Sequence, residues 1–117
     1  MKFNSADYET GYWCARSGQP GRFVSASMRV GYQHGAVDRA LDSSEVSGDL
    51  RDLLRRVSTT HNEWRSAAST SNRDAQSTAD LVSRALMERL KSEPALENIC
   101  PALWARVHVS AGIYLVL

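Results

Sequence analysis

Residues 24–32 read VSASMRVGY, and this stretch decides which fold the sequence predicts. Small or polar residues alternate in it with apolar side chains at every second position: Val24, Ala26, Met28, Val30 and Tyr32. A period of two is typical of a strand that buries one face and exposes the other. The stretch therefore predicts a half-buried strand.

The segment before this stretch supplies a turn and a second extended run. Residues 17–21 read SGQPG, and glycine and proline in such a cluster are strong turn signals. Residues 12–15 read YWCA, an aromatic and apolar run. Two extended runs on either side of a Gly/Pro turn predict a β-hairpin over residues 8–32.

The C-terminal segment shows the same alternation. Apolar side chains occupy every second position of residues 103–109, which read LWARVHV. Residues 110–112, SAG, can turn the chain, and the alternation then continues to Leu117. This pattern predicts a second β-hairpin over residues 102–117, or one bent strand.

The middle of the chain has a helical period. Apolar residues recur there at steps of three and four, in one stripe from Val46 to Ala68 and in another from Ala75 to Leu90. Residues 60–63, THNE, fit a capping box, so residues 46–69 form either one helix or two helices that meet near Ser58. A short helix is also expected over residues 36–41.

The order of these elements predicts an α+β fold, ββ-α(α)α-ββ. The economical arrangement is an antiparallel sheet, built from the N-terminal and C-terminal β-hairpins and packed against two or three central helices. The chain has 117 residues, about the length of one domain, so we expect a single α+β domain over residues 1–117.

Composition indicates a folded protein of the cytoplasm. The hydrophobic fraction is 43% and the charged fraction 23%, both close to the globular average. No apolar run approaches ~20 residues, so no membrane span is expected, and residues 1–9 do not resemble a secretory signal. The two cysteines, Cys14 and Cys100, are predicted to be buried free thiols in a reducing compartment.

No motif in the sequence assigns a catalytic residue, a metal ligand or a cofactor. The histidines and cysteines lack the spacings of zinc sites, and no nucleophile elbow or phosphate-binding loop occurs. His61 and Glu63 match the His-x-Glu of zinc-dependent nucleobase deaminases, but the later Pro-Cys-x-x-Cys is missing. Because His61 lies on an apolar stripe, we expect it to be buried and hydrogen-bonded. A small enzyme with an unrecognised His-containing site remains an alternative.

Nucleic-acid binding is a second alternative. Arg51, Arg55 and Arg56 cluster on the first long predicted helix. Strong binding to a phosphate backbone needs several uncompensated positive charges. Here Asp49 and Asp52 lie among the arginines and the net charge is only +1, so an ion-paired surface is the simpler interpretation.

Protein binding is the interpretation that we prefer. Tryptophan, tyrosine and arginine are the residues that most often anchor interfaces. If the side of the last hairpin that carries Leu103 faces the helices, the outer face carries Trp104, Arg106 and His108. Tyr12 and Trp13 point to opposite faces of the first hairpin, so one of them also faces outward. We predict that these residues bind a partner: Trp104, Arg106, His108, Tyr12 and Trp13.

The sequence therefore predicts a small non-enzymatic protein-binding module, such as an inhibitor, immunity protein or adaptor, without a cofactor. Its protein partner is not identified by the sequence. Trp104 is instead a core residue if a second layer covers it. A homodimer through that face or through an edge strand is a further possibility.

Overall fold

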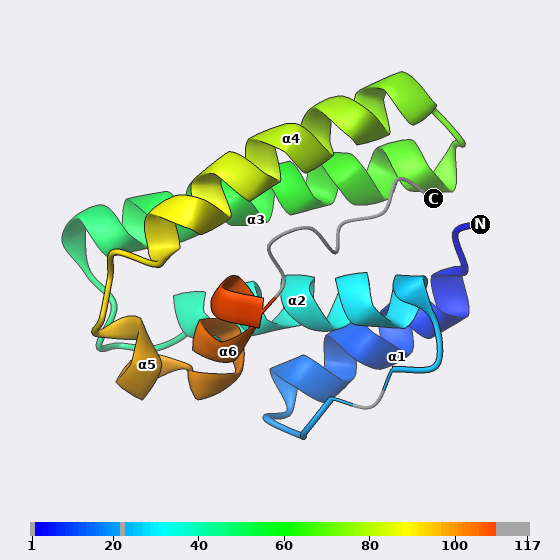
Figure 1. Ribbon diagram of the computed structural model, residues 1–117. Coiled ribbons are helices and arrows are strands. Elements are labelled where there is room, and N and C mark those ends of the chain that lie inside the picture. Colours follow the sequence, from blue (N-terminus) through cyan, green and yellow to red (C-terminus); the bar gives the residue numbers. More distant parts are fainter. Residues whose placement is uncertain (1, 22, 110–117) are drawn as a thin grey trace.

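The computed structural model describes residues 2–21 and 23–109. These residues contain six helices and no strand. The helices are α1 (Ser5–Arg16), α2 (Ala26–Leu41), α3 (Gly48–Ser69), α4 (Arg73–Leu90), α5 (Leu96–Ile99) and α6 (Pro101–Val109). Figure 1 shows α3 and α4 side by side as one layer above α2 and α1, with α5 and α6 at the end of the molecule where α3 begins.

The predicted α+β fold is therefore wrong, and the first β-hairpin is in fact the helix pair α1 and α2. Ser25 starts α2 as its N-cap, because its Oγ accepts a hydrogen bond from the backbone N–H of Met28 at 3.2 Å. The alternation in residues 24–32 is misleading because the buried face of α2 includes the small residues Ser27 and Gly31. In the predicted strand, Ser27 and Gly31 would instead face outward.

Three glycines bring α1 and α2 into direct backbone contact. Gly11 lies on α1, and Gly31 and Gly35 lie one turn apart on α2. A Cβ added at any of them would lie 2.0–2.2 Å from a carbonyl oxygen of the opposite helix. Only glycine permits this approach, so the spacing of these residues fixes how closely the two helices pack.

The second predicted hairpin is also wrong where the structure describes it. Residues 101–109 form α6, which begins at Pro101, a position where the missing N–H of proline leaves no hydrogen bond unmade. Leu103 and Val107 are one helical turn apart and both are buried. The remainder of that prediction, residues 110–117, lies outside the described residues.

The central segments are helices, as the sequence predicts. Residues 48–69 form one uninterrupted helix of 22 residues, so the THNE sequence does not start a second one. The helix expected over residues 36–41 is the end of α2. Within the described chain, none of the helices is both long and apolar enough to cross a membrane.

Arg51 holds the connection between α2 and α3. Its guanidinium donates hydrogen bonds of 2.7–3.0 Å to the backbone carbonyl oxygens of Leu41, Ser43 and Val46. These carbonyls come from the end of α2 and the turn after it. One side chain on α3 therefore ties the two layers together at this end.

Candidate functional site

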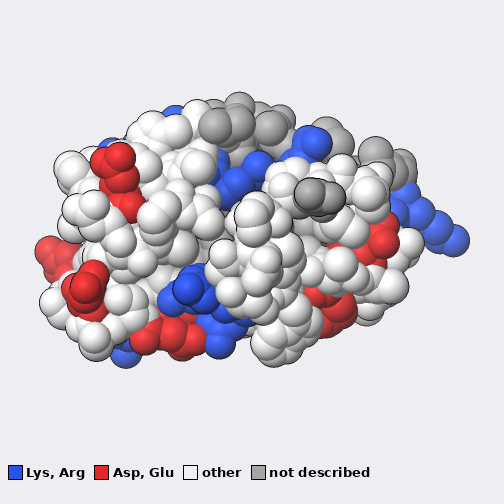
Figure 2. All heavy atoms as spheres, turned by 90° about the horizontal axis from the view of Figure 1, so that it is seen from below, with Lys and Arg blue, Asp and Glu red and all other residues white. Residues whose placement is uncertain are grey.

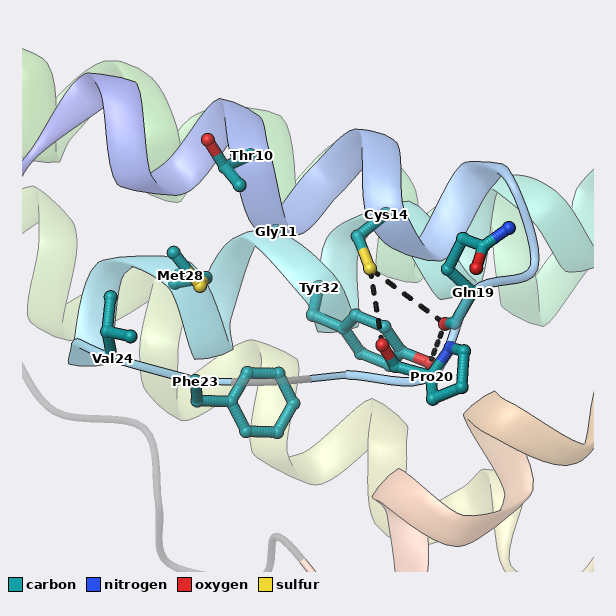
Figure 3. A pocket seen from close by; sticks show the side chains of 9 residues that line it. All are labelled: Thr10, Gly11, Cys14, Gln19, Pro20, Phe23, Val24, Met28 and Tyr32. Carbon is teal, nitrogen blue, oxygen red and sulfur yellow. Dashed lines mark hydrogen bonds between the residues drawn. The ribbon is translucent and has the colours of Figure 1, made fainter.

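An open, mostly apolar groove lies between α1, α2 and the connection that joins them. It encloses about 670 Å³. Figure 3 shows that α1 contributes Thr10 and Cys14, whereas α2 contributes Met28 and Tyr32. The full lining is Thr10, Gly11, Cys14, Gln19, Pro20, Phe23, Val24, Met28 and Tyr32.

The shape of the groove follows from the glycine contact and from the anchoring of the connection. Because Gly11 has no side chain, the backbone of α1 forms part of the groove wall. The hydroxyl of Tyr32 donates a hydrogen bond to the carbonyl oxygen of Gln19 at 3.0 Å. The Sγ of Cys14 lies 3.4 Å from the carbonyl oxygen of Pro20. These contacts hold the connection against both helices, so the groove exists before any ligand binds.

Two large apolar side chains of α1 and of the connection after it are mostly exposed, and one of them, Val24, lines the groove. Val24 is 79% exposed, and Trp13, on α1 next to Cys14, is 58% exposed. Met28 is half-buried in the wall, and its unbranched side chain can adapt to the shape of a ligand. The surface therefore offers apolar area that the described chain does not itself cover.

Two guanidinium groups give one end of the groove a positive charge. The Cζ of Arg106 lies 5.1 Å from the centre of the Phe23 ring, and that of Arg29 lies 5.8 Å from it. Such cation–π contacts keep a guanidinium beside an aromatic ring. At the start of α2, the hydroxyl of Ser25 donates a hydrogen bond to the Asp7 carboxylate at 2.8 Å.

The structure separates the two predicted partner-binding aromatics of α1. Trp13 is exposed, and its Nε1–H donates a hydrogen bond to Glu9 at 3.1 Å. Tyr12 is half-buried, and its hydroxyl donates to Asp38 at 2.5 Å. Burial and this hydrogen bond raise the pKa of Tyr12 to about 12. Tyr12 therefore links α1 to α2, and Trp13 is the residue of the pair that a partner can reach.

On α6 the three predicted residues do not share one face. Trp104 is half-buried and packs against the core, with its ring centre 4.2 Å from that of the exposed His108. Arg106 points to the other side of the helix and reaches Phe23 at the groove. Trp104 is therefore neither fully exposed nor fully buried, and Arg106 is the residue of the three that contacts a lining residue of the groove.

A buried polar network, which the sequence did not reveal, lies between the helix layers. The rings of His34 and His61 stack with their centres 3.9 Å apart and their planes at 14°. The Tyr8 hydroxyl hydrogen-bonds His34 Nδ1 at 2.5 Å, and Ser83 Oγ hydrogen-bonds His61 Nε2 at 3.0 Å. The prediction that His61 is buried and hydrogen-bonded is confirmed. The sequence contains no signal for His34, because it lies between the predicted strand, which ends at residue 32, and the helix expected over residues 36–41.

Burial keeps both histidines neutral. Each side chain is 2% exposed, and loss of hydration lowers the pKa of His61 to about 3. The pKa of His34 is also lowered, chiefly by burial and then by the neighbouring His61 and Arg65. An enclosed, neutral pair suits a structural role better than proton transfer to a substrate. Within residues 2–21 and 23–109, no three His, Cys, Asp or Glu side chains converge as metal ligands would.

The three arginines of the nucleic-acid alternative have different surroundings. The guanidinium of Arg51 donates hydrogen bonds to backbone carbonyl oxygens, whereas Arg55 and Arg56 are exposed. Arg55 lies 3.8 Å from Asp52. On the face shown in Figure 2, basic and acidic side chains form small groups with uncharged surface between them. The described residues visible on this face do not form a continuous basic stripe along which a phosphate backbone would run.

Comparison of the chain with protein-family models, with curated proteins and with solved structures found no match. Function therefore has to be inferred from the geometry and charge of the chain.

Proposed function

We propose that this chain is a small non-enzymatic binding protein whose groove between α1 and α2 takes an apolar side chain of a protein partner. The observation that carries the proposal is the open groove of about 670 Å³ with Val24 79% exposed at it. Exposed apolar surface of this kind is typical of sites that bind another macromolecule. An inhibitor, immunity protein or adaptor acts through such a surface.

The charge beside the groove indicates the chemistry of the partner. Arg29 and Arg106 lie over Phe23, at one end of an otherwise apolar lining. A carboxylate next to the apolar side chain of the partner would be attracted there, and complementary charge selects and orients partners. The partner segment is therefore one in which a large apolar residue stands beside Asp or Glu.

The rigidity of the groove favours tight docking. Gly11, Gly31 and Gly35 allow α1 and α2 to pack with backbone in contact, so the two helices cannot easily move relative to each other. A site that is already in its binding conformation loses less conformational freedom when a ligand enters. The groove consequently needs only local adjustment, for which Met28 is suited.

Selection of peptides from a displayed random library tests this function. We expect the purified chain to enrich peptides that carry a large apolar residue beside Asp or Glu. Val24→Glu places a carboxylate at the groove, so it should weaken binding of the enriched peptides at least about tenfold, or about 1.4 kcal/mol. Leu81→Glu is the matched control, because Leu81 is also an exposed apolar residue, 67% exposed on α4, and it should leave binding unchanged.

Two results would contradict the proposal. One is equal binding of the enriched peptides by the original chain and by Val24→Glu. The other is the absence of any enriched peptide together with binding of small apolar molecules, which would make the groove a small-molecule site.

We also propose the cytoplasm as the compartment. Cys14 and Cys100 are both free thiols, and a reducing environment maintains that state.

A further inference from the structure

The outer face of α4 carries exposed apolar residues at its centre and opposite charges at its ends. Leu81 is 67% exposed and Val82 45% exposed. Positions three and four apart on a helix share a face. By this spacing, one face of α4 presents the following exposed residues: Asp74, Thr78, Leu81, Val82, Ala85 and Arg89.

We propose that this face binds the same face of a second copy of the chain, in an antiparallel two-fold dimer centred between Leu81 and Val82. In a two-fold contact, the same patch on both copies meets itself. Positions at equal distances from the centre then face each other. Leu81 meets Val82 of the second copy, and Thr78 meets Ala85 of the second copy.

The charges at the two ends of the face complement each other in this arrangement. Asp74 is in the first turn of α4 and Arg89 is in the last, each about 11 Å from the centre. Antiparallel packing therefore brings Asp74 to Arg89 of the second copy, and symmetry repeats the pair. Among the described residues, neither Asp74 nor Arg89 is in an ion pair, so both are available to a partner.

The surface beside Val82 is hollow, which suits the same arrangement. Val82 and Leu86 of α4 line a depression of about 290 Å³ whose other wall, on α3, consists of Arg55, Arg56, Thr59 and Thr60. Leu81 of the second copy lies opposite Val82 and can enter this depression. By symmetry, Leu81 of the first copy can enter the same depression of the second copy. Thr78 and Ala85 flank the centre with small side chains, so they allow the two helices to approach closely.

Sedimentation equilibrium of the purified chain over a range of concentrations tests the dimer. We expect a reversible monomer–dimer equilibrium that Leu81→Glu weakens at least about tenfold, which is about 1.4 kcal/mol of association free energy. Val24→Glu is the matched control. It replaces an exposed apolar residue on the groove side and should leave the dimer unchanged, so the dimer and the groove can fail separately.

Charge reversal tests the antiparallel register. Asp74→Arg alone and Arg89→Asp alone each place like charges opposite one another, so each should weaken the dimer. The double variant restores opposite charges and should recover it. In a Cys14→Ser background, a chain with both Thr78→Cys and Ala85→Cys should form a covalent dimer on oxidation, because these positions face each other across the two-fold axis.

Three results would overturn the proposal. They are a monomer at the highest concentration that stays in solution, a dimer that Leu81→Glu does not weaken, and a double charge variant no stronger than the single ones. In the first case a different protein, and not a second copy, would be the partner of this face.

Discussion

At the scale of single residues, Gly31 and Gly35 are important because they lack a side chain. In an ordinary helix, Gly→Ala stabilises by about 0.5–1 kcal/mol. Gly31→Ala should do the opposite, since its Cβ would lie 2.1 Å from the carbonyl oxygen of Tyr8, and backbone atoms cannot move aside cheaply. We expect a loss of at least about 2 kcal/mol in the free energy of unfolding, measured by urea denaturation.

Gly48 provides the control for this prediction. It has φ of +61°, and no atom lies within 4 Å of a Cβ added there. Asparagine tolerates this backbone conformation, so Gly48→Asn should change stability by no more than about 0.5 kcal/mol. If Gly31→Ala were as stable as the original chain, the close helix contact would not exist in solution.

The buried histidine pair predicts how stability depends on pH. The pKa of His61 is about 3 in the folded chain and about 6.5 when unfolded, and the pKa of His34 shifts in the same direction. Between these values the unfolded chain binds more protons, so the histidine contribution is complete above about pH 6.5 and is lost as the pH falls toward 3. Each fully buried histidine contributes a slope of up to about 1.4 kcal/mol per pH unit.

Urea denaturation between pH 7 and pH 4 measures this effect. His61→Gln removes the ring that stacks on His34, so this variant should be less stable than the original chain at pH 7. Because the variant also lacks one titrating group, this difference in stability should shrink as the pH is lowered. His108→Gln is the control because His108 is exposed. Parallel pH profiles for His61→Gln and the original chain would mean that His61 is not buried as a neutral group.

At the scale of elements, the clearest case is the connection between α2 and α3. Arg51 donates to three carbonyl oxygens with its guanidinium fork, and lysine cannot reproduce that geometry. Arg51→Lys should therefore cost about 2 kcal/mol of stability, because it leaves partly buried carbonyls without donors. Arg55→Lys, at an exposed position on the same helix, should cost less than about 0.5 kcal/mol in the same denaturation experiment.

Whether an element could be predicted depended on how its buried face is composed. The face of α3 carries large apolar residues, including Leu54, Val57 and Trp64, so its period of three and four is plain in the sequence. The face of α2 combines Ser27, Gly31, His34 and Gly35 with aliphatic residues. Small and polar residues on a buried face conceal the helical period, because only contact with another backbone explains why they are there.

At the scale of the whole molecule, the sequence predicted correctly which segments fold back on each other near the N-terminus. Residues 17–21 do turn the chain, and the runs on either side of them pack together, as helices and not as strands. The groove could not be predicted from a hairpin, since it depends on the missing side chain of Gly11 and on how Phe23 and Val24 lie between the helices. Of the predicted partner residues, Arg106 reaches the groove through its contact with Phe23, and Trp13 is exposed on α1 outside the groove lining.

Circular dichroism provides a test at this scale. The described residues contain six helices and no strand, so the far-UV spectrum should be that of a predominantly helical protein. We expect the same spectrum for Val24→Glu and Leu81→Glu, because both residues are exposed. A substantial strand component in the original chain would contradict the helical fold.

The glycine contact between α1 and α2 has a consequence for the order of folding. Its members lie within residues 8–35, so the contact closes only a short loop and carries a small entropic cost. On the ribosome, α1 and α2 emerge before α3 and can lock together before α3 has been synthesised. The groove lining lies within residues 10–32, so the lining can be complete before α3 has left the exit tunnel.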